Sequence, residues 1–403
     1  MICVRHPGQD GGAAALEDVA GATDLREGPD GVRAILDLVR RSGPISPREV
    51  AARLGLPLPV VAAVRRECEK RGLLTRDRGM MLSEEGLALV RDVLGMTAGQ
   101  ATECPTCGGY GIVIGKPLRP TLEALAEIER AMPTVDTTLD QSHSLPESTL
   151  RRALYLHHRG ALDGRRVIFL GDDDLLSVAC GLIGESEGGP RARELAALDC
   201  DPRLVDYLRA TAEAHGFGLD ARVHDLRHPL PEDLRGRFDA FVTDPPYTAA
   251  GLELFVSRGL SALQPGSGRH GFLAFAHKPP EEMVAAQALL ARMGLQMREV
   301  LPGFNAYEGG GVTQTSQMIH LVATAQARAT ITGDFEGALY TKEVDPWLRA
   351  YRCQSCRCEL LVGPGREFVT IEVLKAAGCP ECGGTRFRRG RQVRAPEAEK
   401  PQT

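Results

Sequence analysis

Between residues 167 and 323, short apolar runs of strand length alternate with stretches of helical periodicity, and this alternation restricts the possible folds more than any other feature. Strands that alternate with helices predict a parallel sheet covered by helices on both faces. We expect parallel strands at Val167–Leu170, Leu195–Cys200, Arg222–His224, Phe238–Thr243, Gly271–Ala276 and Met297–Leu301, and an antiparallel one at Ser316–Ala323. The sequence therefore predicts an α/β domain over residues 151–345, with a Rossmann-like, seven-stranded and mostly parallel sheet.

Acidic residues follow four consecutive strands of this predicted sheet. They occur in Gly171-Asp172-Asp173-Asp174, at Asp199 and Asp201, at Asp225, and in Asp244-Pro245-Pro246-Tyr247. Ligands of open parallel sheets bind beyond the carboxyl ends of the strands. One acid at such a turn is as readily explained as a cap for the next helix. Acids at four successive strand ends instead predict a binding site for positively charged ligands.

The first of these loops differs from an ordinary nucleotide-binding turn. Such turns use several glycines so that the backbone can approach a pyrophosphate, whereas here Gly171 is followed directly by three carboxylates. This loop would repel a pyrophosphate and attract a cation. We expect Asp199 to accept hydrogen bonds from a ribose diol and Asp225 to meet an adenine amino group. Together these features predict a site for an adenosyl sulfonium.

The motif Asp244-Pro245-Pro246-Tyr247 points to an amine as the second substrate. A similar motif, with Asp or Asn first, occurs in methyltransferases that alkylate amino nitrogens. The rigid Pro-Pro step would direct a carbonyl and a carboxylate at the nitrogen, and the aromatic ring could contact an ammonium group. A protonated amine cannot attack until a carboxylate accepts its proton. The alternative is a proline-rich turn that merely ends a strand.

The two acidic motifs together resemble those of the branched-chain polyamine synthases, and the resemblance covers roughly residues 30–325. It includes the later segment from Asn305 through Tyr307 to Gly311. The resemblance implies transfer of aminopropyl groups from decarboxylated S-adenosylmethionine to the secondary amine of spermidine, giving N(4)-aminopropyl- and N(4)-bis(aminopropyl)spermidine. Methylthioadenosine would be released. No redox cofactor is implied.

The resemblance also implies roles for individual residues. We expect Asp173, Asp174 and Asp244 to be catalytic, and any of them could remove the proton. The expected substrate-binding residues are Gly171, Asp172, Asp199, Asp225, Pro245, Tyr247, Asn305 and Tyr307. His277 follows the fifth strand; it could line the pocket, but for a lone histidine we favour a structural role.

Residues 30–94 predict a winged helix-turn-helix. Ser46-Pro47-Arg48-Glu49 is typical of a capped helix start, and we expect helices at Val50–Leu54 and Pro59–Arg71 and a strand-turn-strand at Leu73–Leu82. The recognition helix mixes acids with its bases, which is a weak phosphate-binding pattern. We therefore favour a dimerisation or substrate-covering role over DNA binding, and expect a homodimer.

The remaining segments are a leader, a connector and a cysteine-rich end. Residues 1–29 predict a disordered leader, residues 95–150 a connector with a Cys104/Cys107 knuckle, and residues 391–403 a disordered tail. In residues 346–390, 22 residues separate the pair Cys353 and Cys356 from the pair Cys379 and Cys382, a zinc-ribbon spacing that predicts a structural zinc ion. Cys358 is a spare ligand. Metal binding by the first knuckle is left open, because no partner pair lies nearby in sequence.

Composition restricts the class of protein and its partners. A net charge of −5 argues against a nucleic-acid-coating protein, and no apolar run approaches the roughly 18 residues of a membrane span. We therefore expect a cytoplasmic protein. Because thiols stay reduced in the cytoplasm, the eleven cysteines indicate metal ligation and not disulfides. Only six Lys and the single Asn305 occur, which fits either codon bias or a thermophile.

Two other functions remain as alternatives. An S-adenosylmethionine-dependent amino-methyltransferase of DNA or RNA would account for Asp244-Pro245-Pro246-Tyr247, the winged helix and the zinc ribbon. It would not account for the acids at 172–174, because a polyanion should avoid them. A transcription regulator that senses adenosyl metabolites would need a degenerate catalytic domain, and the intact motif argues against degeneration.

Overall fold

The computed structural model describes residues 9–75, 79–96, 110–136, 138–307, 315–344, 347–363, 366–368 and 371–394. These form two compact units. The first comprises Met1–Val135, Ser142–Pro245 and Glu253–Phe335, and the second comprises Asp136–Gln141, Pro246–Leu252 and Glu336–Thr403. Among the described residues, no helix combines the length and apolar character that crossing a membrane requires.

The first unit contains the predicted sheet. Its strands are β1 (Arg166–Leu170), β2 (Glu194–Asp199), β3 (Asp220–Val223), β4 (Ala240–Thr243), β5 (His270–Ala276), β6 (Leu295–Ala306) and β7 (Thr315–Ala323). Their order is β3-β2-β1-β4-β5-β7-β6. Only β7 runs antiparallel to its neighbours β5 and β6, which confirms the seven-stranded, mostly parallel prediction. Strand β6 continues five residues beyond the predicted Leu301.

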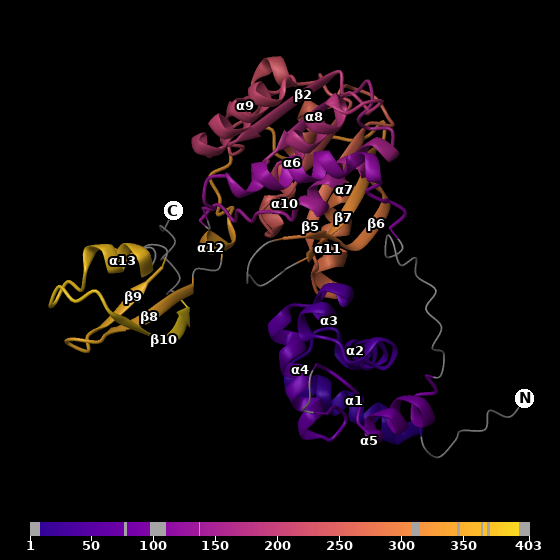
Figure 1. The fold of residues 1–403 in the computed structure, drawn as a ribbon, viewed down its shortest axis with the longest axis vertical. Coiled ribbons are helices and arrows are strands. Elements are labelled where there is room, and N and C mark those ends of the chain that lie inside the picture. Colours follow the sequence, from indigo (N-terminus) through magenta and orange to yellow (C-terminus); the bar gives the residue numbers. More distant parts are fainter. Residues whose placement is uncertain are drawn as a thin grey trace, which may run out of the picture. The chain divides into compact units, whose positions relative to one another are not determined.

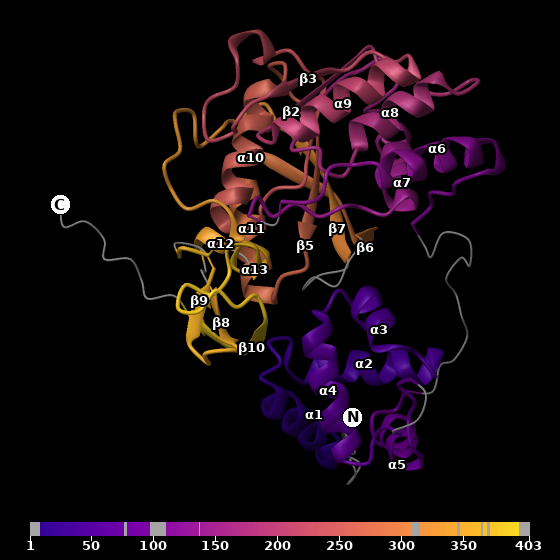
Figure 2. The same ribbon diagram turned by 60° about the vertical axis from the view of Figure 1, so that its left-hand side comes forward.

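Helices cover both faces of this sheet, as the prediction required (Figures 1 and 2). On one face lie α6 (Arg119–Arg130), α7 (Pro146–His158), α8 (Leu176–Glu185) and α9 (Pro202–His215), and on the other α10 (Ala249–Ala262) and α11 (Pro280–Arg292). The predicted connector, residues 95–150, extends too far along the chain, because it includes α6. Leu125 and Ile128 of α6 are buried in the core beside the sheet, so this helix belongs to the α/β domain.

The N-terminal helices have a hydrophobic core of their own. They are α1 (Gln9–Thr23), α2 (Gly28–Ser42), α3 (Pro47–Leu54), α4 (Leu58–Lys70) and α5 (Glu84–Ala88). The hydroxyl of Ser46 accepts a hydrogen bond from the Glu49 N–H at 3.1 Å, the cap that the sequence predicted. The predicted strand-turn-strand is reduced to single bridges, Ile45 to Met80 and Leu74 to Leu82.

The prediction of a disordered leader is wrong for residues 9–29. Leu16, Val19 and Ala20 of α1 are buried in the N-terminal core, as is Leu25. The first three share the one-sided spacing of an amphipathic helix. The Gly- and Ala-rich start of the segment concealed this short stripe.

The second unit contains a small three-stranded sheet. Its elements are α12 (Thr341–Val344), β8 (Trp347–Cys353), β9 (Glu359–Val362), α13 (Ile371–Ala377) and β10 (Phe387–Arg394), with strand order β10-β8-β9. One buried apolar cluster in this unit contains Val362, Phe368 and Leu374, and Leu348 and Ala350 of β8 are also buried. The boundary of the expected disordered tail is corrected, because β10 continues to Arg394.

Candidate active site

The acidic loops meet where the order of the large sheet reverses. The chain moves outward from β1 through β2 to β3 and then returns to β4 on the other side of β1. Such switch points open a crevice at the carboxyl ends of the two strands. Gly171 follows β1 with φ +74°, and Asp244 follows β4. The topology therefore brings together the two motifs that the sequence singled out.

The loop after β1 is held by the first turn of α8. One carboxylate oxygen of Asp172 accepts a hydrogen bond from the Ser177 N–H at 3.1 Å, and the other accepts one from its hydroxyl. Asp174 accepts a hydrogen bond from the Leu176 N–H at 3.2 Å. Leu175 lies between Asp174 and the start of α8. Its backbone has a left-handed conformation with φ +55°, and its side chain is fully buried. Hydrogen bonds and packing therefore fix this loop.

A buried arginine that sequence reasoning missed pairs with this loop. Arg152 of α7 donates a charge-assisted hydrogen bond to Asp174, and their side chains are only 1% and 5% exposed. Burial alone would lower the pKa of Arg152, but Asp174, Tyr307 and Asp244 together raise it above its ordinary value. The signal in the sequence was a charged residue at the helical spacing of Thr149 and Leu156, which lie with it on the buried face of α7. Arg152 balances one of the carboxylates.

Two of the remaining acids are destabilised in their charged form. Burial is the largest cause that raises the pKa of Asp172, followed by the charge of Asp174. Burial, Asp174 and Asp244 also raise the pKa of Asp173 well above its usual range. A hydrogen bond from the Ser142 N–H at 2.8 Å opposes the rise at Asp173. A bound cation would relieve this repulsion.

Asp244 is connected to the ends of β6 and β7 by a chain of polar side chains. The Tyr307 hydroxyl donates to Asp244 at 2.6 Å and lies 2.8 Å from the Ser316 hydroxyl. The Asn305 amide N–H donates to Ser316 at 2.9 Å and to the Gln317 carbonyl at 3.2 Å. The Asn305 side chain is fully buried, and its amide oxygen has no hydrogen-bond partner among the described residues. These contacts place Asn305 and Tyr307 beside Asp244; residues 308–314 lie outside the described part.

Asp199 joins the loops after β1 and β2. Its two oxygens accept hydrogen bonds from the Asp201 N–H at 2.8 Å and the Asp172 N–H at 3.2 Å. It is 7% exposed, and burial raises its pKa to about 6. By contrast, Asp201 is the N-cap of α9 and accepts a hydrogen bond from the Arg203 N–H. The capping role therefore describes Asp201, whereas Asp199 borders the acidic loop.

The remaining predicted site residues, Asp225, Pro245 and Tyr247, follow the strand ends in sequence but differ in their exposure to solvent. Asp225 accepts a hydrogen bond from the Arg227 N–H at 2.9 Å and is partly exposed. Pro245 is buried. Tyr247 is partly buried and belongs to the second compact unit, in which Thr248 donates to the Leu339 carbonyl at 2.8 Å.

His277 has the structural role that we favoured. Its Nε2 accepts a hydrogen bond from the Gly303 N–H at 3.1 Å, and burial lowers its pKa. A Cβ atom on Gly55 of the N-terminal domain would lie 2.6 Å from this ring. His277 therefore packs against the helical domain, and among the described residues no hydrogen bond or ion pair joins it to the acidic loops.

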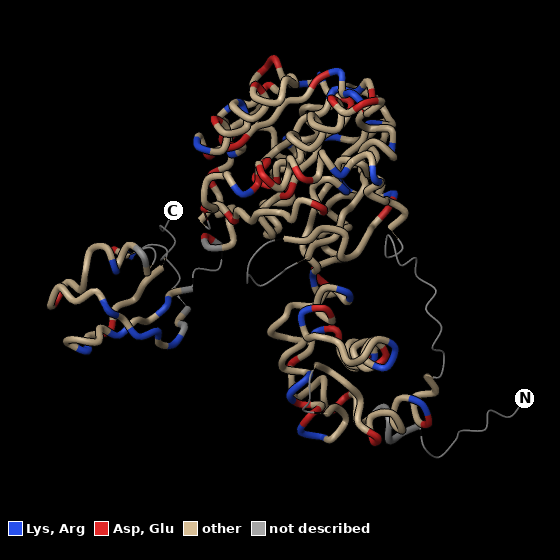
Figure 3. The backbone as a smooth tube through the Cα atoms, in the orientation of Figure 1, with Lys and Arg blue, Asp and Glu red and all other residues tan. Residues whose placement is uncertain are grey.

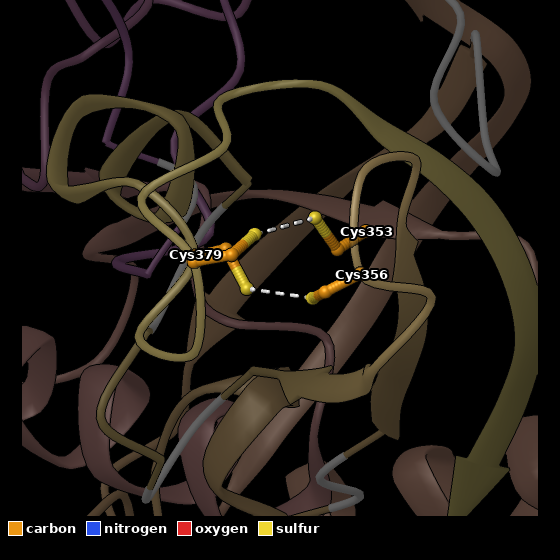
Figure 4. A group of neighbouring side chains, drawn as sticks. Cys353, Cys356 and Cys379 are labelled. Atoms are coloured by element: carbon orange, nitrogen blue, oxygen red, sulfur yellow. Dashed lines mark hydrogen bonds between the residues drawn. The ribbon is translucent and has the colours of Figure 1, made fainter.

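A cluster of thiols in the second unit could hold a metal ion. The sulfur atoms of Cys353, Cys356, Cys379 and Cys382 all lie within 4.8 Å of one another. Figure 4 shows Cys353 and Cys356 facing the loop that carries Cys379. The Cys353–Cys382 and Cys356–Cys379 sulfur separations are both 3.6 Å. Tetrahedral Zn–S bonds of about 2.3 Å require sulfur separations of about 3.8 Å, so the donor set fits zinc.

A fifth thiol lies close to this cluster. The sulfur of Cys358 is 3.3 Å from that of Cys356 and 3.2 Å from that of Cys379. Cys358 is therefore close enough to the cluster to act as the additional ligand that the sequence indicated. Cys104 and Cys107 lie outside the described residues.

Comparisons with known proteins agree with this geometry. A family model for the branched-chain polyamine synthase A C-terminal domain matches residues 121–358, and a model for winged helix-turn-helix DNA-binding domains matches residues 32–75. The structure is similar to that of the branched-chain polyamine synthase from Thermus thermophilus in complex with N4-aminopropylspermidine and 5'-methylthioadenosine. That likeness has a TM-score of 0.66 and 30% identity, and covers 83% of this chain and 98% of that one.

Two relatives show how far the similarity extends along the chain. Uncharacterized protein MJ0675 of Methanocaldococcus jannaschii is 36% identical over 376 residues, which are 93% of this chain and 92% of that protein. The N(4)-bis(aminopropyl)spermidine synthase of Thermus thermophilus is 37% identical over 236 residues, or 58% of this chain and 66% of that one.

The fold, the acidic switch point and these matches define a Rossmann-type transferase of the aminopropyltransferase class. More narrowly, the chain belongs to the branched-chain polyamine synthase family.

Proposed function

We propose that the chain transfers an aminopropyl group from decarboxylated S-adenosylmethionine to the secondary amine of spermidine, giving a branched-chain polyamine and methylthioadenosine. The observation that carries the proposal is the cluster of Asp172, Asp173, Asp174 and Asp244 around one buried arginine. Close carboxylates repel one another unless cations separate them. A polyamine and a sulfonium both supply positive charge. The Thermus thermophilus relative was crystallised with a polyamine, N4-aminopropylspermidine, and with 5'-methylthioadenosine, the neutral thioether that remains when such a sulfonium has lost its aminopropyl group.

In the proposed reaction the spermidine nitrogen first loses its proton to a carboxylate. Its lone pair then attacks the aminopropyl carbon beside the sulfonium; the C–N bond forms, the C–S bond breaks, and the electron pair stays on sulfur as a neutral thioether. Asp173 and Asp244 are our candidates for the proton acceptor. Raised pKa values favour proton acceptance by Asp173, and Tyr307 orients Asp244 through its 2.6 Å hydrogen bond.

Asp174 has a different role in this proposal from the one the sequence suggested. Its ion pair with Arg152 holds it in place, so we assign it to positioning the loop and attracting the aminopropyl ammonium. Asp172 supports the same loop. Asp199 and Asp225 would bind the ribose and the adenine. Pro245 and the unpartnered oxygen of Asn305 would border the acceptor amine. For Tyr247 we propose substrate binding from its place in the sequence motif alone.

The test is incubation of the purified protein with spermidine and either decarboxylated or ordinary S-adenosylmethionine, with products identified by mass spectrometry. We expect spermidine to gain one or two aminopropyl groups with the first donor only. Methylation of added DNA or RNA with ordinary S-adenosylmethionine would replace the proposal with the amino-methyltransferase alternative. A chain that modifies neither substrate would contradict both functions.

We further propose a structural zinc ion at the four clustered cysteines, a homodimer, and a cytoplasmic location. The sulfur geometry supports the first, and the need for reduced thiols supports the last. Metal analysis of the purified chain and its mass by light scattering would test the first two. A metal-free native protein or a monomer would contradict them.

A further inference from the structure

The small C-terminal sheet has a charge opposite to that of the whole chain. Residues 347–394 contain ten Arg and Lys but only four Glu, whereas the chain carries a net charge of −5. Figure 3 shows Lys and Arg positions along the strands of this sheet. Much of this charge lies on the β10 side, where Arg386, Arg388, Arg389 and Arg391 are all exposed. Averaging over the whole chain conceals this local excess.

The arginines are placed where ordinary sheet packing would not favour them. Arg388 of β10 is directly opposite Arg352 of β8 in the antiparallel register. Like charges directly opposite each other destabilise a strand pair. Glu359 offers Arg352 an exposed contact at 3.9 Å. Within the described chain, no ion pair joins Arg388, Arg389 or Arg391 to an acid.

The backbone of β10 is irregular where these arginines occur. The pairing with β8 shifts between Arg389 and Gln392, which leaves a bulge at Gly390 and Arg391. β10 is an edge strand, and charges on edge strands can prevent aggregation. Protection of an edge does not require an arginine opposite another arginine, so it leaves the Arg352–Arg388 pair unexplained.

We propose that the basic edge of this sheet, which consists of Arg352 and of Arg386, Arg388, Arg389 and Arg391 on the β10 side, binds the phosphate backbone of nucleic acid. Arg352 and Arg388 lie on one face of the sheet, and Arg389, opposite Tyr351, lies on the other. Guanidinium groups bind phosphate oxygens through paired hydrogen bonds. Alternate residues of a strand are about 6.7 Å apart, which is close to two phosphate steps of about 3.4 Å along one strand of a duplex. A regularly spaced polyanion therefore fits the arginines better than a scattered set of acidic groups. This differs from our expectation from the sequence, in which the helix-turn-helix, the total charge and the acids at 172–174 argued against nucleic acid.

The test measures binding of the full-length protein to a fluorescein-labelled DNA duplex and to an RNA duplex by fluorescence anisotropy, at salt concentrations from about 50 to 200 mM. The variant combines Arg388→Gln, Arg389→Gln and Arg391→Gln. Its matched control combines Arg191→Gln, Arg193→Gln and Arg292→Gln, which remove the same charge from exposed positions of the α/β domain. Circular dichroism and zinc content would verify that both variants fold.

For the first variant we expect binding weaker by roughly tenfold or more, with the slope of log affinity against log salt reduced by about three. The control should retain the native slope. Binding to DNA, RNA or both would support the inference. It would be overturned by equal losses in the two variants, by no salt-dependent binding of the native chain, or by tighter binding to phosphatidylserine vesicles or poly-glutamate.

Discussion

The large and small sheets of this molecule use charge in opposite ways. At the switch point of the large sheet, buried carboxylates surround a single buried arginine and are fixed by backbone N–H groups. On the small sheet, arginines are exposed and make few ion pairs among the described residues. Burial makes the first set sensitive to a few neighbours, whereas water screens the second. We therefore expect selective recognition of small cations at one sheet and salt-dependent binding at the other.

Stability also differs between the two sheets. The large sheet packs against helices through an extensive buried core, whereas the small sheet has a much smaller set of buried apolar residues, among them Val362, Phe368 and Leu374. Small domains with little buried apolar surface usually need metals or cross-links. A metal ion at the cysteine cluster, as proposed above, would supply this stabilisation.

Removal of the metal should have the largest effect, because zinc contributes about 10–16 kcal/mol to the folding of small thiolate domains. We expect Cys379→Ser, or a chelator, to abolish hydrogen-exchange protection in β8–β10 and leave β1 and β4 protected. Cys358→Ser is the matched control and should retain the metal and the protection. Unchanged exchange in β8–β10 after chelation would show that the small sheet folds without metal.

Asp244→Asn should reduce turnover by about 10²–10⁴-fold, because it removes a candidate proton acceptor without changing side-chain size. Methylthioadenosine release under saturating substrates measures the effect. Asp201→Asn is the control: it removes an acid that caps α9 after β2, and turnover should remain near normal. Equal losses in the two variants would mean that total negative charge, rather than a specific carboxylate, controls the rate.

Arg152→Met should destabilise the α/β domain by about 3–5 kcal/mol, because it leaves Asp174 buried without its cationic partner. Urea unfolding followed by circular dichroism measures the change. Adding Asp174→Asn should recover part of the loss, since the unpaired charge is then removed. A double variant no more stable than Arg152→Met would contradict the proposed pairing.

The pH dependence of stability should report on Asp199, whose pKa burial raises from about 4 to about 6. A carboxyl with a raised pKa in the folded state stabilises the protein when protonated. This contribution should be complete below about pH 4 and lost as the pH rises through about 6. The shift corresponds to about 3 kcal/mol at most. Urea unfolding of the native chain and of Asp199→Asn at several pH values measures it, and a constant difference between them would contradict the assignment.

The sequence predicted the parts of the site that depend on local pattern. Acidic residues follow the carboxyl ends of the predicted strands. In a parallel sheet these ends lie at the same edge, so the sequence predicted that the acids would be close together. The spacing of the cysteines likewise predicted a cluster that the structure contains. In both cases the relevant residues are adjacent in sequence to the elements that position them.

The remaining features depend on contacts between distant segments. Arg152 pairs with Asp174 across 22 positions of the chain, and nothing in either segment specifies the partner. Tyr307 reaches Asp244 only because β6 extends beyond its predicted end. The helix α1 was missed because its burial depends on packing against α2 and α4. Such pairings follow from tertiary structure and not from periodicity.

The left-handed conformation of Leu175 has a consequence for substrate choice. A non-glycine residue in this conformation costs about 1–2 kcal/mol, and burial of its side chain compensates for that cost. The adjoining acids are thus held at fixed separations before any amine enters. Rigid separations should discriminate polyamines by the number of methylene groups between their nitrogens, so homologues longer or shorter than spermidine should react more slowly even when their total charge is identical.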